Sequence, residues 1–335
     1  MHVPVTLAAP LFALAACASL ATSWLLVSRL ERVGERLGLS EALLGLVGCA
    51  RRRRPRDHRG DHRPGDPGAA GGGGVVLGSN VFNLAALLGL GAVVAGRIVL
   101  HRKVVALSGA VALWVSVVCL ITVTGIVDSA AGLVLVLAVL VPYVVLLGIR
   151  RTERRRLPLP RPWATWLASA VDEEELELVA AIRPRRGSAR DLLVAVPALV
   201  VVILAAVAME RGASTLGQDY SVAQLVVGGL VLAAVTSLPP AVAAVHLAAK
   251  GRGAAALSTA FTSNTLNVTV GLLIPTLFFQ LARPSGQSLL IAGWYVGLTA
   301  LTLALAYAGR GLERWAGLVI IAGYAAFVVA VLIVS

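Results

Sequence analysis

Residues 78–84 read Gly-Ser-Asn-Val-Phe-Asn-Leu, and residues 262–268 read Thr-Ser-Asn-Thr-Leu-Asn-Val. The second copy follows the first by 184 positions, about half of the 335-residue chain. In each copy the pattern Ser-Asn-x-x-Asn places two amides about one helical turn apart, on one face of a helix. Apolar residues follow both copies, so we expect the amides to face the inside of a membrane bundle. The repeat therefore predicts two related halves.

Composition agrees with a membrane bundle. Of the 335 residues, 58% are apolar and 14% are charged, and the mean hydropathy is +0.86. A soluble protein of this size needs a larger charged surface. Runs such as Leu133–Ile149 and Leu192–Met209 approach the roughly 20 apolar residues that cross about 30 Å of hydrocarbon. Because the backbone in lipid must satisfy its own hydrogen bonds, we predict an all-α polytopic protein with the lipid bilayer as a partner.

Window hydropathy predicts about ten membrane spans. They lie near residues 4–28, 38–68, 75–98, 103–126, 128–148, 191–210, 221–249, 254–281, 287–308 and 314–334. Lys and Arg concentrate in the loops that follow the odd-numbered spans. The positive-inside rule therefore places these loops in the cytoplasm and both termini outside the cell membrane. The net charge of +12 is thus explained by membrane loops, and nucleic acid is not expected as a partner.

The longest connection, residues 149–190, is predicted to be a cytoplasmic loop. Trp163 and Trp166 lie beside basic residues, which is typical of a segment at the membrane surface. The acidic run from Asp172 to Glu177 is interpreted as a solvated linker, and a regulatory cation site is the alternative.

A further motif makes the repeat specific. Residues 236–240 read Thr-Ser-Leu-Pro-Pro within an apolar span, where proline is expected to interrupt helical hydrogen bonding. Together with Gly78 and the residues after it, this motif resembles the two α-repeat signatures of the cation/calcium exchanger superfamily. The resemblance implies ten transmembrane helices as two inverted five-helix repeats, here residues 1–148 and 191–335. It also implies exchange of Ca²⁺ against Na⁺, K⁺ or H⁺.

Candidate cation ligands follow from the resemblance and from the chemistry of the side chains. Amide oxygens are hard ligands suited to Na⁺ or Ca²⁺, and interrupted helices near the midplane aim backbone carbonyls and helix dipoles at a cation. The alternative is that these residues are ordinary interhelical hydrogen-bonding groups. The candidates are the amides of Asn80, Asn83, Asn264 and Asn267, with Asn80 and Asn264 as direct metal ligands, and the oxygens of Ser79, Ser263, Thr236 and Ser237; Gly78, Pro239 and Pro240 mark the motifs. His246 is interpreted as a packing or polar-cavity residue, with proton coupling as the alternative.

Residues 51–63, which read Arg-Arg-Arg-Arg-Pro-Arg-Asp-His-Arg-Gly-Asp-His-Arg, interrupt the pattern where the second span should lie. The superfamily places Pro-Glu at the repeat position that Pro55-Arg56 occupies, and the Glu is a principal cation ligand. If Arg is encoded by CGN codons, a one-base shift makes Pro and Glu possible at this position. The same shift makes the Asp-His and His-Arg junctions encode Ile or Thr. We therefore predict that residues 51–74 are translated out of frame, and genuine divergence is the alternative.

The second half also lacks its usual acid, since Pro240 stands at that position, and no acidic residue lies in the middle of a predicted span. Tight Ca²⁺ sites usually include carboxylates. The predicted function is a secondary-active cation antiporter without a cofactor that transports Ca²⁺ or Na⁺, with the ion and the oligomeric state left open. One alternative is a degenerate, non-transporting relative or pseudogene product. The other is an unrelated polytopic membrane enzyme or carrier, although the spans contain no zinc, Ser/Lys or phosphate-loop motif.

Overall fold

The computed structural model describes residues 5–37, 76–148, 160–180, 233–277 and 284–334, with scattered positions between 193 and 215. The first half contributes helices α1 (Val5–Leu37), α4 (Leu90–Ala95), α5 (Arg102–Val123) and α6 (Ser129–Gly148), together with the π-helix η1 (Leu84–Gly89). Helix α8 (Arg161–Ala180) follows. The second half contributes α11 (Ala233–Ala249), α12 (Gly253–Val268), α13 (Ile274–Thr276), α14 (Gly286–Ala308) and α15 (Arg314–Val334), together with the π-helix η3 (Thr269–Leu273). The strands are β1 (Arg97–Val99) and β2 (Gly311–Glu313).

Five helical segments in the described residues are long and apolar enough to cross a membrane. They are Val76–Ala95, Arg102–Val123, Ser129–Leu146, Gly286–Ala308 and Arg314–Val334. These segments match predicted spans to within a few residues, so the chain is a mostly helical, multi-pass membrane protein. The predicted span 38–68, the basic stretch 51–74 and much of 191–232 lie outside the described residues. The count of ten spans and their inverted arrangement therefore stay predictions.

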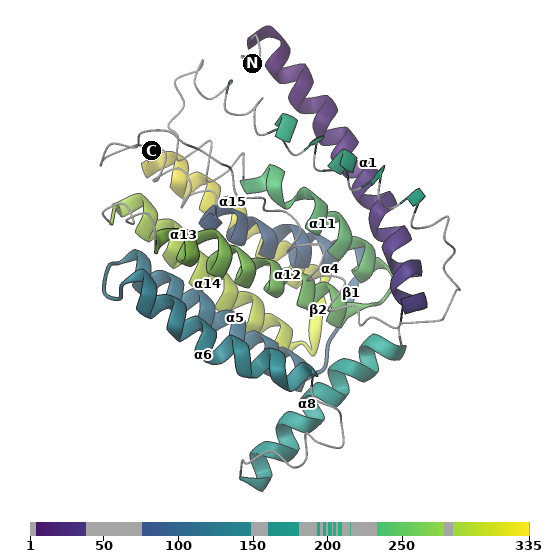
Figure 1. Ribbon diagram of the computed structural model, residues 1–335, viewed down its shortest axis with the longest axis vertical. Helices are drawn as coiled ribbons and strands as arrows, with labels where there is room; N and C mark the ends of the chain where they lie inside the picture. Colours follow the sequence, from purple (N-terminus) through teal and green to yellow (C-terminus); the bar gives the residue numbers. More distant parts are fainter. Residues whose placement is uncertain are drawn as a thin grey trace.

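Two expectations need correction, and the structure makes a third more specific. The third span ends at Ala95 rather than near residue 98, because Gly96 adopts a φ of 82° and ends the helix. The 149–190 connection contains the 20-residue helix α8, and α8 projects from the bundle at the end that carries the strands (Figure 1).

The other correction concerns Pro239 and Pro240. Helix α11 continues through both prolines, whereas an interruption was expected there. A proline removes its own backbone donor, and the neighbouring residues of this helix maintain the helical path. The irregular turns occur instead in η1 and η3, the π-helices of the two halves.

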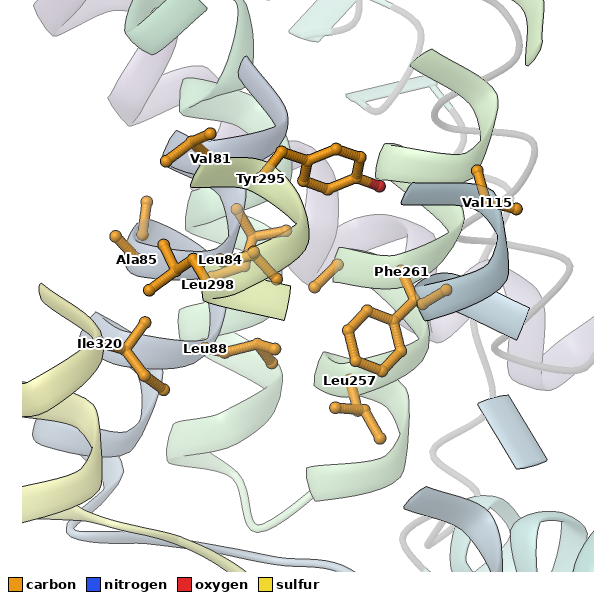
Figure 2. Packing of buried hydrophobic residues seen from close by; sticks show 14 of the residues in the cluster. Val81, Leu84, Ala85, Leu88, Val115, Leu257, Phe261, Tyr295, Leu298 and Ile320 are labelled. Atoms are coloured by element: carbon orange, nitrogen blue, oxygen red, sulfur yellow. The ribbon is translucent and has the colours of Figure 1, made fainter. Parts of the chain in front are cut away.

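A continuous apolar core joins the two halves. In Figure 2, Leu84 and Leu88 of the Val76–Ala95 segment pack among residues of α5, α12, α14 and α15, including Phe261, Tyr295 and Ile320. Gly317 of α15 lies so close to η1 that a Cβ atom there would meet the carbonyl oxygen of Gly89 at 2.5 Å. Small residues of this kind let membrane helices approach closely, which increases their van der Waals contact.

A short β-ribbon joins the two halves at one end of the bundle. β1 pairs with β2 in antiparallel register, with Ile98 opposite Leu312. The basic segments 97–103 and 310–314 meet at this ribbon, and Gly253, just after Arg252, packs against Val99. The start of α1 and the end of α15 lie toward the other end (Figure 1). Three of the loops predicted to be cytoplasmic therefore lie together, at the end opposite the start of α1 and the end of α15.

Candidate cation-binding site

The two Ser-Asn-x-x-Asn segments lie at matching places in their helices. Asn83 is the last residue before η1, and Asn267 lies two residues before η3. A π-helical turn adds one residue to a helix and often occurs at functional sites. Each amide pair is therefore followed directly by a distorted turn, in both halves of the chain.

The first half bonds to the second through Asn83. Its side-chain Nδ2 donates to Oδ1 of Asn264 at 2.8 Å and approaches Oγ of Ser263 at 3.3 Å. Both partners belong to the second copy of the motif. The amide of Asn83 therefore bridges from the helix of residues 76–83 to α12.

The second half returns the same contacts through Asn267. Its Nδ2 donates to Oδ1 of Asn80 at 3.0 Å and to Oγ of Ser79 at 3.1 Å. Ser79 and Asn80 correspond to Ser263 and Asn264 under the 184-residue offset, as Asn83 corresponds to Asn267. Each set of bonds therefore has its counterpart in the other half of the chain. We call these six residues the crossed amide network.

The crossed amide network lies in the interior of the bundle. Asn80 and Asn83 are 0% exposed, Asn264 is 2% exposed, and Asn267 is partly buried. Two buried atoms of the network have no hydrogen-bond partner among the described residues: Nδ2 of Asn80 and Oδ1 of Asn83. Buried polar atoms without partners are uncommon, and in a native structure they indicate strain or a place for water or an ion. Oδ1 of Asn83 is thus a buried oxygen that could accept a hydrogen bond from water or bind a cation.

One hydrogen bond, made by Asn264, has no counterpart in the other half. Nδ2 of Asn264 donates to the main-chain oxygen of Asn80 at 3.1 Å. The corresponding atom in the first half, Nδ2 of Asn80, has no partner in the described part of the chain. Both unpartnered buried atoms of the network therefore belong to the helix of residues 76–83.

The other predicted ligands come from α11, which packs against η1 and α12. Ser237 is 3% exposed, and Pro239 and Pro240 are half-buried. The backbone of Thr236 lies within α11, but its side chain is outside what the structure describes. Gly78 is buried one residue before Ser79. The structure thus brings together the serines and asparagines of the two copies, and it places the α11 motif on an adjoining helix.

His246 contacts α1. The residue is 5% exposed, and its ring meets Trp24 of α1 edge-on, with the ring centroids 4.3 Å apart. His246 therefore contributes to the packing between α1 and α11.

The side chains of the crossed amide network carry no charge. Among the described residues there is no group of three or more His, Cys, Asp or Glu side chains that could hold a metal ion. Asp128 and Glu313 are exposed and lie outside the helices, in a loop and a strand. The oxygens of the crossed amide network are amide and hydroxyl oxygens, which are ligands for a hard cation.

Sequence reasoning found these residues through the repeat but did not predict their bonds to one another. The equal spacing in the two copies is the signal that could have suggested the reciprocal pairing. The π-helical turns and the β-ribbon had no comparable signal, because both depend on how the two halves pack.

Comparisons with known proteins agree with the geometry. Residues 191–333 match the family described as sodium/calcium exchanger protein. The sodium/calcium exchanger MaX1 of Methanosarcina acetivorans is 25% identical over 143 residues, which are 43% of this chain and 41% of that protein. The human sodium/potassium/calcium exchanger 1 is 38% identical over 69 residues, which are 21% of this chain and 6% of that protein. The matches thus span less than half the length of these relatives.

The whole chain also resembles a solved structure. A structure of the sodium-calcium exchanger NCX_Mj, soaked with Na⁺ and Sr²⁺, matches with a TM-score of 0.64 at 19% identity. The match covers 98% of this chain and 99% of that chain. At this identity the likeness establishes the fold. Together with the family match, it confirms the resemblance that residues 78–84 and 236–240 predicted.

Proposed function

We propose that this chain, a member of the cation/calcium exchanger superfamily, is a secondary-active cation antiporter that binds its cation at the crossed amide network. The transported ion is Ca²⁺ or Na⁺, and no cofactor takes part. The protein lies in the cell membrane with both termini outside. Residues 1–148 and 191–335 form its two five-helix repeats.

The reciprocal pairing of Asn83 with Asn264 and of Asn267 with Asn80 carries the proposal. Structural hydrogen bonds between membrane helices need no such exchange, because one good bond on either side stabilises the contact. A cation that is bound between two related halves takes equivalent ligands from both. The network supplies them as the Oδ1 atoms of four asparagines and the Oγ atoms of two serines.

The unpartnered Oδ1 of Asn83 supports a direct role in binding. A buried carbonyl-type oxygen without a donor costs roughly 1–3 kcal/mol, and a cation at this oxygen removes that cost. The neighbouring amides donate to one another in the present structure. Small rotations of these side chains replace amide-to-amide bonds with oxygen-to-cation contacts, and the two halves separate or approach as the bonds change.

The choice of ion depends on carboxylates. Ca²⁺ takes six to eight oxygen ligands, and tight sites include acids, which the crossed amide network lacks. If residues 51–74 are read in the shifted frame, a Glu becomes possible at position 56, and one carboxylate joins the site. We therefore assign Na⁺ to the chain as written and Ca²⁺ to the frame-restored protein.

Ion flux in proteoliposomes tests the proposal. The full chain and its frame-restored form are reconstituted, and Na⁺-driven uptake of Ca²⁺ and exchange of Na⁺ are measured. We expect Asn83→Ala and Asn267→Ala to abolish flux, whereas Gln287→Ala retains it. Gln287 is a matched control, because its amide donates to the main-chain oxygen of Val334 at the end of the bundle away from the ribbon. Flux that is unchanged in folded Asn83→Ala and Asn267→Ala proteins would overturn the site.

A second candidate is a relative that no longer transports. Two observations favour it: the arginine at position 56 and the proline at position 240, where the superfamily usually has acids. The frame-restored protein separates the two candidates. Absence of flux from this protein, with thermal unfolding that remains cooperative, favours the non-transporting relative. An enzyme is not supported, since the relatives named above are exchangers.

A further inference from the structure

The end of the bundle that carries the β-ribbon is strongly cationic. Arg97, Arg102, Arg310 and Arg314 are exposed there. In residues 96–103 and 307–315, which form the ribbon and its flanking turns, Glu313 is the single acidic residue. A surface of this charge attracts phosphate groups.

The fold brings two of these arginines to one corner. The main-chain nitrogen of Leu100 donates to the oxygen of Arg310 at 3.2 Å, which holds the turn before β2 against the start of α5. Nε of Arg102 donates to the main-chain oxygen of Tyr307 at 3.2 Å. Arg102 and Arg310, which are far apart in the sequence, therefore flank the last turn of α14. We call Arg102, Tyr307 and Arg310 the arginine corner.

The arginine corner is held in place before any ligand arrives. The guanidinium carbon of Arg102 lies 5.3 Å from the centre of the Tyr307 ring, a cation–π contact. The bond from Nε leaves the terminal nitrogens of this planar fork to donate elsewhere. Arg310 has a φ of 49°, a left-handed conformation that is uncommon for residues other than glycine. The chain thus keeps an arginine in a turn that glycine or asparagine would adopt more easily.

Exposed aromatic rings lie beside the same arginines. Tyr307 is 49% exposed and Trp315 is 55% exposed. Tyr and Trp collect where membrane helices meet the lipid headgroups. α14 ends and α15 begins at this ribbon, so the arginine corner lies where two candidate membrane spans end.

We propose that the arginine corner binds the phosphate of an anionic phospholipid. A guanidinium donates two parallel hydrogen bonds to phosphate oxygens, a geometry that lysine cannot provide. The acyl chains of the lipid would lie along the apolar surfaces of α14 and α15, beside the exposed aromatic rings of Tyr307 and Trp315. Lipid at this site ties the ribbon, and with it both halves of the chain, to the membrane surface. The inference is independent of which ion is transported.

Thermal unfolding of the full chain in neutral detergent tests the proposal. Short-chain phosphatidylglycerol is compared with phosphatidylcholine of the same acyl chains, and with inorganic phosphate at equal concentration. We expect phosphatidylglycerol alone to raise the unfolding midpoint. The Arg102→Gln/Arg310→Asn double variant should lose most of this shift. Asn at position 310 accepts the left-handed backbone, so the turn is preserved.

Lys250→Gln is the matched control, because it removes one exposed cation from the same end of the bundle but lies in the turn between α11 and α12. We expect this variant to keep the full shift. An equal loss in Lys250→Gln would show a bulk charge effect and overturn the arginine corner. A full shift in the double variant, or equal shifts with phosphatidylcholine or with inorganic phosphate, would also overturn the proposal.

Discussion

Asn83 and Asn264 come from different halves of the chain, and their buried side chains share a hydrogen bond of 2.8 Å. The same bond recurs between Asn267 and Asn80 at 3.0 Å. These hydrogen bonds bring amides from both halves to the same region of the bundle interior. The stability of the contact between the halves should therefore depend on each of these side chains.

The bond between Asn83 and Asn264 can be measured with a double-mutant cycle. Either change to Ala leaves a buried amide without its partner, so we expect each to lower the free energy of unfolding by about 1–3 kcal/mol. The double variant should lose less than the sum, with a coupling of roughly 0.5–3 kcal/mol. Denaturation in detergent is the measurement, and Asn83→Ala with Gln287→Ala is the control pair. Additive losses for Asn83 and Asn264 would contradict the bond.

The close approach of α15 and η1 predicts that Gly317→Ala is destabilising. The new Cβ would lie 2.5 Å from the carbonyl oxygen of Gly89, so the helices must separate, at a cost of about 1–3 kcal/mol. Gly297→Ala is the matched control, since a Cβ at that position of α14 meets nothing within 4 Å. Thermal unfolding of the two variants compares them directly. Equal midpoints would mean that α15 and η1 are not in close contact.

The β-ribbon predicts a similar effect at Gly311. This residue has a φ of 135°, and an added Cβ would collide with the carbonyl oxygen of Ile98. Gly251 also has a positive φ, 75°, but has open space around it. Gly251→Ala therefore measures backbone strain alone, of the order of 1 kcal/mol, and Gly311→Ala should be clearly worse. Unfolding midpoints check the order, and the reverse order would argue against the ribbon.

The grouping of basic loops predicts the orientation of the bundle. In a variant without the native cysteines, Gly286→Cys should react with an impermeant maleimide on intact cells, and Lys250→Cys should react only after permeabilisation. A Cβ at Gly286 meets no other atom within 4 Å, so the change is structurally mild. Labelling of both positions from one side would contradict their placement at opposite ends of the bundle. The reverse labelling pattern would invert the proposed topology.

The reading frame of residues 51–74 is tested by resequencing the gene together with closely related loci. We expect an insertion or deletion before codon 51 and a compensating one near the glycines at positions 71–74. Arginine codons that stay in frame in close relatives, with no length change, would end the hypothesis and establish genuine divergence.

The sequence by itself determined the membrane character, the positions of most described spans and the residues of the candidate site. Hydropathy is a local property, and a repeat such as Ser79-Asn80 and Ser263-Asn264 is visible without a structure. The superfamily followed from the same few motifs. For these features, neighbouring residues alone carry the information.

Only the tertiary structure decided how the motifs meet. The partner of each asparagine, the contact of Gly89 with Gly317 and the pairing of β1 with β2 all join residues far apart in the chain. The π-helical turns η1 and η3 are local, but no residue pattern in the sequence marked them. The continuous α11 also differs from the local expectation, because packing around the helix outweighs the two backbone donors that Pro239 and Pro240 lack. Contacts of this kind depend on the relative placement of whole helices, which local sequence patterns do not encode.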